Sequence, residues 1–225
     1  MSKSGGINRA YGRSLGAKLT FAFLHGLLVA LCIWLAFGPI DWINTPRAQL
    51  LCVCVIVYFL RHLITLFVLL KRQVQLSEVF GLILFFCVFE VGFLLLGTGE
   101  ILGGTAALSW IDAVAFGLFL IGSALNSVSE LQRWVWKKKP SSKGLCYTEG
   151  LFAYSLHINY FGDAVLFTGW AILTASLIAW AVPLFVISGF VFFHIPPLDQ
   201  YLEERYGDSF NAYAAKTAKF VPFLY

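Results

Sequence analysis

The sequence predicts an all-α fold, a polytopic transmembrane bundle of about six helices with an amphipathic C-terminal helix on its inner face. Of its 225 residues, 59% are hydrophobic and 12% are charged, whereas soluble globular chains are about half apolar and about a quarter charged. Apolar stretches of about 20 residues recur along the chain. Basic residues gather on one predicted side of the membrane. A bilayer, rather than a soluble core, is therefore the expected environment.

Long apolar stretches locate the predicted spans. Four of them can each cross a bilayer alone: Leu19–Ile40, Ala48–Leu70, Leu76–Gly97 and Thr105–Asn126. The apolar region Phe161–His194 is too long for one helix and predicts a helical hairpin that turns near Ala175–Trp180. We expect one membrane domain over residues 1–225, with the four N-terminal spans in 1–126 and a loop, the hairpin and a tail in 127–225.

Basic residues predict the orientation of the spans. With the N-terminus inside, 14 of the 16 Lys and Arg residues fall in inner segments, Arg47 falls outside and Arg61 lies within a span. The basic, acid-free residues 1–18 superficially resemble a mitochondrial transit peptide, but we interpret them as the inner flank of the first span. Both termini are thus predicted on the cytoplasmic or matrix side of a bacterial inner membrane or an organellar membrane.

The tail after the last span is predicted to form an amphipathic helix. Pro196 and Pro197 are expected to stop the last span, and apolar residues at helical spacing then predict an amphipathic helix: Leu198, Tyr201, Leu202, Tyr206, Phe210 and Tyr213.

The five cysteines include no CxxC pair and mostly lie in apolar runs, so neither a metal site nor a disulfide framework is expected. The net charge of +4 is explained by topology, so nucleic acid is not an expected partner.

Ionisable residues at membrane depth are candidate functional groups, because burying them is costly unless they are paired or hydrated. An ion pair between Arg61 and Glu90 is predicted, either to lock two helices or to line a substrate cavity. Glu78 is close to the inner surface and is expected to be solvated. Asp112 and His25 are expected to find partners on neighbouring helices.

Polar residues leave the fourth predicted span on one helical face: Asn126, Ser129, Glu130, Arg133 and Lys137. Such a face could hold a ribose through Asn126 and Glu130 while Arg133 and Lys137 neutralise phosphates. The alternative is that this basic loop is only a topology signal.

The following segment carries a more specific pattern. Residues 149–163 read EGLFAYSLHINYFGD, which resembles the motif G-L-[FW]-x-Y-S-R-H-P-N-Y-x-G-[ED] of the steroid 5-alpha-reductase-like membrane proteins. Their wider superfamily includes sterol C14 reductases and isoprenylcysteine carboxyl methyltransferases. The tail is similar to the ending of that superfamily through residues 198–207 and through Tyr213, Thr217 and Phe220–Pro222. The resemblance covers about 100 residues, from Asn126 to the C-terminus.

This resemblance implies a membrane-embedded, NADPH-dependent reductase of a conjugated double bond in a lipid, sterol or isoprenoid substrate. It implies cofactor-binding roles for Asn126, Glu130, Arg133, Lys137, Tyr154, His157, Asn159, Asp163 and Tyr201. For the catalytic acid that polarises the substrate carbonyl, Tyr58 with Glu78 or Glu90 could serve. The expected partners are membrane lipids and a lipophilic small molecule.

Two alternatives remain open because the motif departs from its relatives at Leu156–Ile158, which replaces Arg-His-Pro. One is an S-adenosylmethionine-dependent methyltransferase of a lipophilic substrate, which the missing Arg disfavours, since that residue helps hold S-adenosylmethionine in the methyltransferase branch. The other is a non-catalytic subunit of a larger membrane complex, for example a mitochondrial one, which would bring partner subunits.

Overall fold

The computed structural model describes residues 14–101 and 106–224, and all regular elements in this part of the chain are helical. Five helices in it are long and apolar enough to cross a membrane: Leu15–Phe37, Thr45–Leu69, Leu76–Thr98, Trp110–Trp136 and Leu177–Tyr206. A shorter apolar helix spans Ile158–Leu173. The predicted polytopic helical bundle is confirmed. The basic flank before residue 14 and the predicted start at Thr105 lie outside the described residues.

The second span begins earlier than predicted. After α1 (Leu15–Phe37), α2 (Thr45–Ile64) starts where Asn44 Oδ1 accepts a hydrogen bond from Arg47 N at 3.1 Å, and Pro46 occupies its first turn. This is a side-chain N-cap with proline in the first turn, both common at helix starts. Arg47 is therefore a buried helical residue and not part of an outer loop, which corrects the prediction. The helix ends as the π-helical η2 (Thr65–Leu69).

The next two spans keep the predicted order but not all the predicted ends. α3 (Leu76–Phe86), η3 (Cys87–Val91) and α4 (Gly92–Thr98) form one continuous helix that ends at Gly99 with φ +82°. α5 (Trp110–Trp136) continues well past Asn126, the predicted end of its span. The polar face that follows this span is therefore helical as far as Trp136, in agreement with the helical spacing of its residues.

The hairpin forms, but the prolines do not end it. α6 (Ile158–Leu173) turns through Ala175, whose φ is +54°, into a helix built of η6 (Leu177–Trp180), α7 (Ala181–Ser188), η7 (Gly189–His194) and α8 (Ile195–Tyr206). The expected stop at Pro196 is wrong. A π-helical segment precedes both prolines, which occupy the first turn of α8, where a missing N–H is tolerated. Gly207, at φ +52°, then leads into α9 (Asp208–Ala214).

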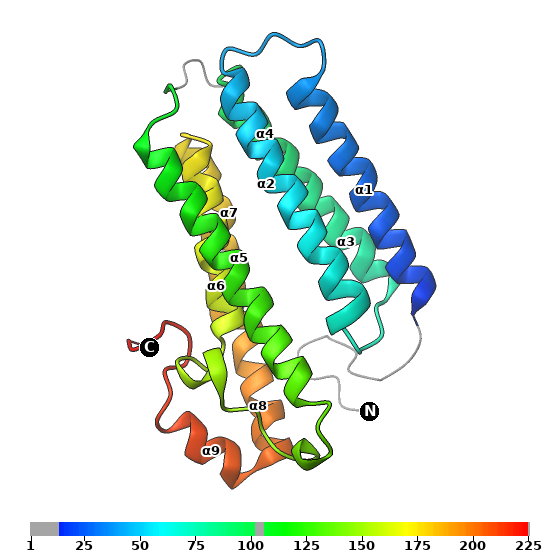
Figure 1. The fold of residues 1–225 in the computed structure, drawn as a ribbon, viewed down its shortest axis with the longest axis vertical. Helices are drawn as coiled ribbons and strands as arrows, with labels where there is room; N and C mark the ends of the chain where they lie inside the picture. Colours follow the sequence, from blue (N-terminus) through cyan, green and yellow to red (C-terminus); the bar gives the residue numbers. More distant parts are fainter. Residues whose placement is uncertain (1–13, 102–105, 225) are drawn as a thin grey trace. The chain divides into compact units, whose positions relative to one another are not determined.

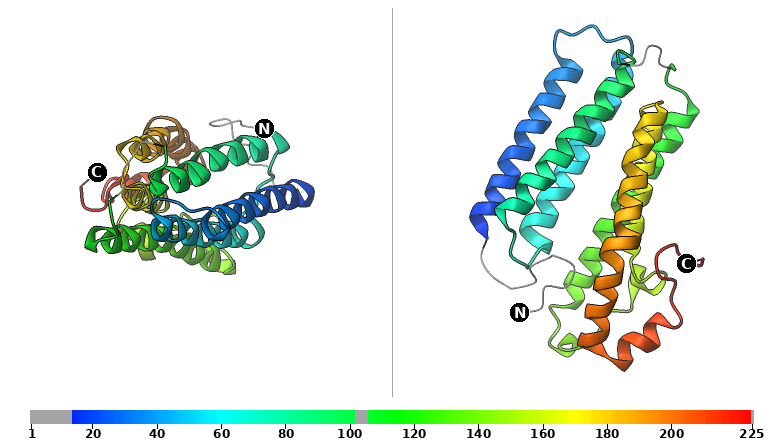
Figure 2. Two further views of the ribbon diagram at one scale, coloured as in Figure 1. Left: turned by 90° about the horizontal axis from the view of Figure 1, so that it is seen from above. Right: turned by 180° about the vertical axis from the view of Figure 1, so that it is seen from behind.

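The described residues form two compact units. The N-terminal unit comprises 14–101, 106–119 and 167–184, and the C-terminal unit comprises 120–166 and 185–224. In the N-terminal unit, α1, α2 and the α3–α4 helix pack side by side, as both side views show (Figures 1 and 2). Aromatic rings pack edge to face within this unit, on these three helices and on the parts of α5 and α6 that belong to it: Phe21, Tyr58, Phe86, Phe89, Phe93, Phe119 and Trp170.

The membrane-crossing helices are mostly uncovered by protein. Only 22–33% of the most apolar window of each span is buried. Large side chains such as Phe23, Leu84 and Phe185 are more than 60% exposed, which in water would form adhesive patches. These surfaces are suited to lipid, and the chain is a multi-pass integral membrane protein. Its orientation and its organisation as a single domain stay predictions.

In the C-terminal unit, α5 and α6 approach closely at two glycines. A Cβ on Gly122 would lie 2.5 Å from Gly162 O and 2.8 Å from Leu166 Cα, so only glycine fits there. Small residues at such contacts let helices in a membrane pack backbone to backbone.

At the other end of the unit, α8 turns into α9, drawn in orange and red in Figure 2. A small apolar cluster there consists of Leu156, Phe210 and Tyr213. The elements η4 (Pro140–Ser142) and η5 (Gly150–Ala153) interrupt the loop between α5 and α6.

Candidate functional site

A hydrogen-bonded network joins the polar face of α5 to the start of α6. Asn126 Nδ2 donates to Asn159 O at 3.0 Å and to Asp163 Oδ2 at 2.9 Å. Asn159 Nδ2 donates to Glu130 Oε1 at 3.0 Å, and Arg133 pairs with the other Glu130 oxygen at 2.5 Å. The spacing of these residues on α5 places them on one face. The structure thus brings together five of the predicted cofactor-binding residues.

The segment before α6 is fixed by the C-terminal tail. Leu156 N donates to Ala218 O at 2.8 Å, and Ser155 Oγ donates to Phe220 O at 2.9 Å. Tyr213 OH donates to Phe152 O at 2.5 Å. Because these bonds satisfy backbone groups that no helix pairs, the irregular segment has a defined path next to α9.

His157 forms the centre of a second polar group. Its Nε2 lies 2.7 Å from Asp199 Oδ1, and Asp199 Oδ2 lies 3.1 Å from Lys219 Nζ. The imidazole is 1% exposed and stacks on Tyr160 with an interplanar angle of 9°. Sequence reasoning missed Asp199 and Lys219. The acidic tail helix was noted, but nothing in its spacing selects this carboxylate as the partner of a residue on another element.

A pocket opens beside both groups. It encloses about 60 Å³, within about 540 Å³ of empty space that includes the solvent at its mouth. Its wall combines two cations, one thiol, an imidazole, an amide and several rings, and it is formed by Arg133, Lys137, Cys146, Tyr147, Phe152, Leu156, His157, Asn159, Leu198, Leu202, Tyr206, Phe210 and Tyr213. All of these residues belong to the C-terminal unit. A concave site with a few converging polar groups on an apolar wall is typical of a small-molecule site.

The environment shifts the ionisation of several pocket groups. Burial lowers the pKa of the Lys137 ammonium, and the nearby Arg133 and Arg205 cations lower it further. Burial raises the pKa of the Cys146 thiol, and the Lys137 and Arg133 cations offset part of that rise. Burial also raises the pKa of the Tyr213 phenol. At neutral pH the thiol and phenol therefore keep their protons, and the cations give the wall its charge.

Two predicted cofactor-binding residues lie elsewhere in the C-terminal unit. Tyr154 is 51% exposed and packs against Phe223. Tyr201 accepts a hydrogen bond from Arg205 on the solvent side of α8. Neither belongs to the pocket wall, so their cofactor roles stay predictions.

The predicted catalytic residues are in the N-terminal unit. Glu90 is fully buried, and its Oε1 pairs with His25 Nε2 at 2.8 Å while its Oε2 has no hydrogen-bond partner. The predicted Arg61–Glu90 pair is therefore wrong, because α1 supplies the partner that faces Glu90. Glu78 pairs with Arg72, and Tyr58 packs against the His62 ring at a centroid distance of 4.2 Å. A neighbouring helix thus supplies the expected partner for His25 Nε2, while His25 Nδ1 has no hydrogen-bond partner among the described residues.

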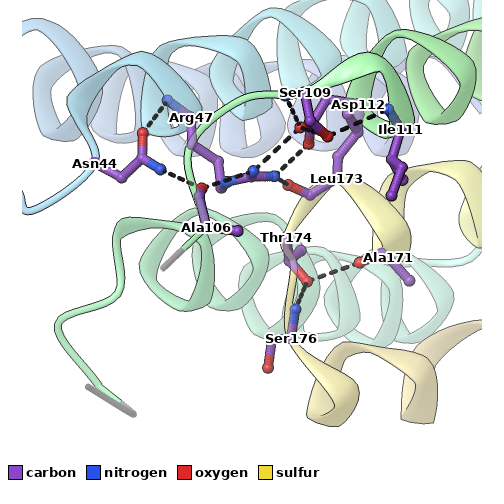
Figure 3. Close-up of polar contacts among 10 residues, drawn as sticks. All are labelled: Asn44, Arg47, Ala106, Ser109, Ile111, Asp112, Ala171, Leu173, Thr174 and Ser176. Atoms are coloured by element: carbon purple, nitrogen blue, oxygen red, sulfur yellow. Dashed lines mark hydrogen bonds and ion pairs between the residues drawn. The ribbon is translucent and has the colours of Figure 1, made fainter. Parts of the chain in front are cut away.

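Another buried cluster in the N-terminal unit surrounds Arg47 (Figure 3). The guanidinium, 1% exposed, binds both oxygens of Asp112 at 2.5 and 3.2 Å. It also donates to Leu173 O at 2.5 Å and to Ala106 O at 3.0 Å. Its main-chain partner Asn44 donates to the same Ala106 oxygen at 2.9 Å. These contacts join four segments, and they confirm that a neighbouring helix satisfies Asp112.

Together, these observations define a multi-pass membrane protein whose C-terminal unit has a pocket lined by two cations and several aromatic rings. The model of the family DUF1295, described as a protein of unknown function, matches residues 69–217, about two-thirds of the chain, and the chain belongs to this family. The chain is also similar to a protein of Ustilaginoidea virens named probable O-methyltransferase ustE, with 32% identity over 104 residues. That match covers 46% of this chain and 37% of the other protein.

Proposed function

We propose that this chain is a membrane-embedded, S-adenosylmethionine-dependent methyltransferase of a lipophilic acceptor, with its cofactor site in the C-terminal pocket. The observation that carries the proposal is a pocket wall in which Arg133 and Lys137 converge with aromatic rings. The likeness to a protein named as an O-methyltransferase favours this cofactor over NADPH.

The groups of the pocket suit the groups of the cofactor. Arg133 and Lys137 would bind its carboxylate by charge-assisted hydrogen bonds, and the rings of Tyr147 and Phe152 would pack against its adenine or its sulfonium. The cavity of about 60 Å³ exceeds the roughly 10–15 Å³ that one water needs on this measure, so it has room for a small polar group such as a carboxylate. The rest of the cofactor would extend into the larger space at the mouth. When bound, the cofactor supplies a methyl group on a positively charged sulfur.

Other residues of the pocket wall carry positive charge where the related motif has its Arg. Leu156 replaces the Arg of the related motif, and its side chain is 6% exposed in the cluster with Phe210 and Tyr213. It also lies in the pocket wall, together with Arg133 and Lys137. Arg133 on α5 and Lys137 directly after α5 therefore provide the positive charge of the wall, although residue 156 is apolar.

A second candidate is the NADPH-dependent reductase of a conjugated double bond. The network of Asn126, Glu130, Asn159 and Asp163 favours it, because the resemblance to the reductases implies cofactor contacts for these four residues. Arg133 and Lys137 would then bind phosphates. The candidates for its catalytic acid, Tyr58 with Glu78 or Glu90, belong to the N-terminal unit, where Glu90 is bonded to His25.

Thermal unfolding in detergent separates these candidates. A ligand at 100 times its dissociation constant stabilises the folded state by about 2.7 kcal/mol. We expect S-adenosylmethionine and S-adenosylhomocysteine to raise the Tm and NADPH and NADH to leave it unchanged. The variant Lys137→Gln should lose most of the shift, and the exposed Lys143→Gln should keep it. A shift with NADPH alone would establish the reductase instead, and no shift with any of the four would favour a non-catalytic subunit.

Alkylation of Cys146 gives a second readout that needs no acceptor. Cys146 is half-buried in the pocket wall, so a bound cofactor should slow its reaction with N-ethylmaleimide. In a Cys87→Ser background the remaining cysteines, Cys32, Cys52 and Cys54, are buried. Protection by S-adenosylhomocysteine but not by NADPH is the expected result.

A further inference from the structure

His157 and Asp199 have the geometry of a base and the group that orients it. Asp199 Oδ1 lies 2.7 Å from His157 Nε2, and Lys219 Nζ lies 3.1 Å from the other carboxylate oxygen. The imidazole is 1% exposed and belongs to the pocket wall. The three residues come from the start of α6, from α8 and from the tail.

The hydrogen bonds fix which nitrogen can accept a proton. The Asp199 carboxylate binds an ammonium on one side, and an ionised carboxylate can only accept. Nε2 of neutral His157 therefore carries the hydrogen that it donates to Asp199, and Nδ1 keeps the lone pair. A carboxylate behind an imidazole holds its tautomer and stabilises the imidazolium that forms when the ring takes a proton.

We propose that His157 is the general base of methyl transfer, with Asp199 as its positioning residue, and that the acceptor is a hydroxyl group of a lipophilic alcohol or phenol; this rests on the proposed function. The proton of the acceptor hydroxyl moves to His157 Nδ1. The acceptor oxygen forms a bond to the methyl carbon, and the bond from that carbon to the cofactor sulfur breaks with its electron pair left on sulfur. The products are the methyl ether, S-adenosylhomocysteine and a protonated His157.

The acceptor class follows from the need for a base. A carboxylate is already ionised at neutral pH and could accept a methyl group without losing a proton. A hydroxyl must lose its proton as the new bond forms, so a positioned base accelerates its methylation.

The other groups of the pocket are poor bases at neutral pH. Burial keeps the proton on the Cys146 thiol and on the Tyr213 phenol. Arg133 is a permanent cation that offers no lone pair. A neutral His157 imidazole offers a lone pair on Nδ1 while its Nε2 faces Asp199.

The test measures methyl transfer and cofactor binding in the same variants. The full chain, in vesicles made from the total lipid extract of its host membrane, receives S-adenosylmethionine with a tritiated methyl group. Radioactivity in the organic phase is followed from pH 5 to pH 9. Cofactor binding is measured by the Tm shift in detergent. The variants are His157→Gln and Asp199→Asn, and the control is Glu204→Gln, which changes an exposed carboxylate on the same helix.

We expect His157→Gln to keep the Tm shift and to transfer methyl at least about 100-fold more slowly, as loss of a general base does. Asp199→Asn should also keep the shift and transfer more slowly. In this variant, the fall of the transfer rate on the acid side of the pH profile should move to lower pH. An imidazolium without its carboxylate loses its proton more readily. The ionisable groups next to this pair are unchanged in these variants: Lys219 binds Asp199, Tyr160 stacks on the imidazole, and Arg133 and Lys137 belong to the same pocket wall. Glu204→Gln should match the wild type.

Three results would count against the assignment. Wild-type transfer by His157→Gln would overturn it while leaving the methyltransferase intact. A proportional loss of binding and transfer in both variants, without a change in pH profile, would assign a structural role to the pair. If His157→Gln does not fold, His157→Ala with added imidazole replaces it, and transfer that imidazole fails to restore overturns the proposal. A wild-type chain that binds no S-adenosylmethionine or transfers no methyl would refute the proposed function itself.

Discussion

Asn126 on α5 donates a hydrogen bond from Nδ2 to Asp163 Oδ2 on α6 at 2.9 Å, and the same nitrogen donates to Asn159 O at 3.0 Å. One amide therefore joins two elements that are separated by a loop of 21 residues between Trp136 and Ile158. One turn further along α5, Glu130 accepts a hydrogen bond from Asn159 and forms an ion pair with Arg133. The network places Asn159 and Arg133 in the pocket wall.

Replacing Asn126 should loosen the site. Asn126→Ala removes both hydrogen bonds and leaves Asp163 with one donor fewer, which should cost about 1–3 kcal/mol. We expect a lower Tm in detergent and a smaller Tm shift with S-adenosylmethionine. Ser127→Ala, on the next position of the same helix, should change neither. An unaltered cofactor shift in Asn126→Ala would show that the network does not support the pocket.

The Arg47–Asp112 pair should dominate the stability of the N-terminal unit. Arg47→Leu leaves a buried carboxylate without its guanidinium, which typically costs about 3–5 kcal/mol. The double variant Arg47→Leu with Asp112→Leu should recover part of the loss, because no unpaired charge remains. Unfolding in detergent measures both effects.

The control for this prediction is another Arg–carboxylate pair in the same unit. Arg72 and Glu78 are 24% and 32% exposed, and such pairs contribute at most about 1 kcal/mol. Arg72→Gln should therefore change the Tm little. Equal losses in Arg47→Leu and Arg72→Gln would contradict the role of burial.

Close packing of α5 on α6 should depend on Gly122. A methyl group there would meet Gly162 O at 2.5 Å, and backbone atoms cannot move aside as a flexible side chain could. We expect Gly122→Ala to destabilise the protein despite the better helix propensity of alanine. Gly117→Ala, on the same helix where nothing lies within 4 Å of the added atom, should be neutral or slightly stabilising. Thermal unfolding of the two variants side by side decides the matter.

The reactivity of Cys146 should report the charge of the pocket. Its pKa is raised from 9.0 by burial, and Lys137 offsets part of the rise. The midpoint of its alkylation rate against pH should therefore lie above 9.0 in the Cys87→Ser background. Lys137→Gln should move that midpoint further up and slow the reaction at pH 8.5. A faster reaction in this variant would mean that the Lys137 ammonium does not act on the thiol.

The same shift links stability to pH. Because the folded state holds the Cys146 proton more tightly than the unfolded state, this thiol contributes stability below pH 9.0 that is lost as the pH rises through the raised pKa. Cys146→Ser should lose that alkaline component of the unfolding free energy.

Long-range partners explain the errors made from the sequence. Hydropathy predicts the limits of a membrane span but not of the helix that carries it, and α5 continues beyond Asn126 to Trp136. Membrane depth predicts an Arg61–Glu90 pair, but depth does not tell which helix faces which, and His25 of α1 is the partner of Glu90. Pro196 predicts a stop, whereas the π-helical η7 before it allows the helix to continue.

The sequence by itself determined that this chain crosses a membrane several times and that its most specific polar motif, at residues 149–163, precedes an apolar helix, because hydrophobic length and local motifs are properties of consecutive residues. The tertiary structure alone decided that His157 meets Asp199 and Lys219, that Arg47 meets Asp112, and that Leu156 lies in the wall that Arg133 and Lys137 charge. These contacts join residues far apart in the chain, and no period or spacing encodes them, since they depend on how each helix is rotated against its neighbours.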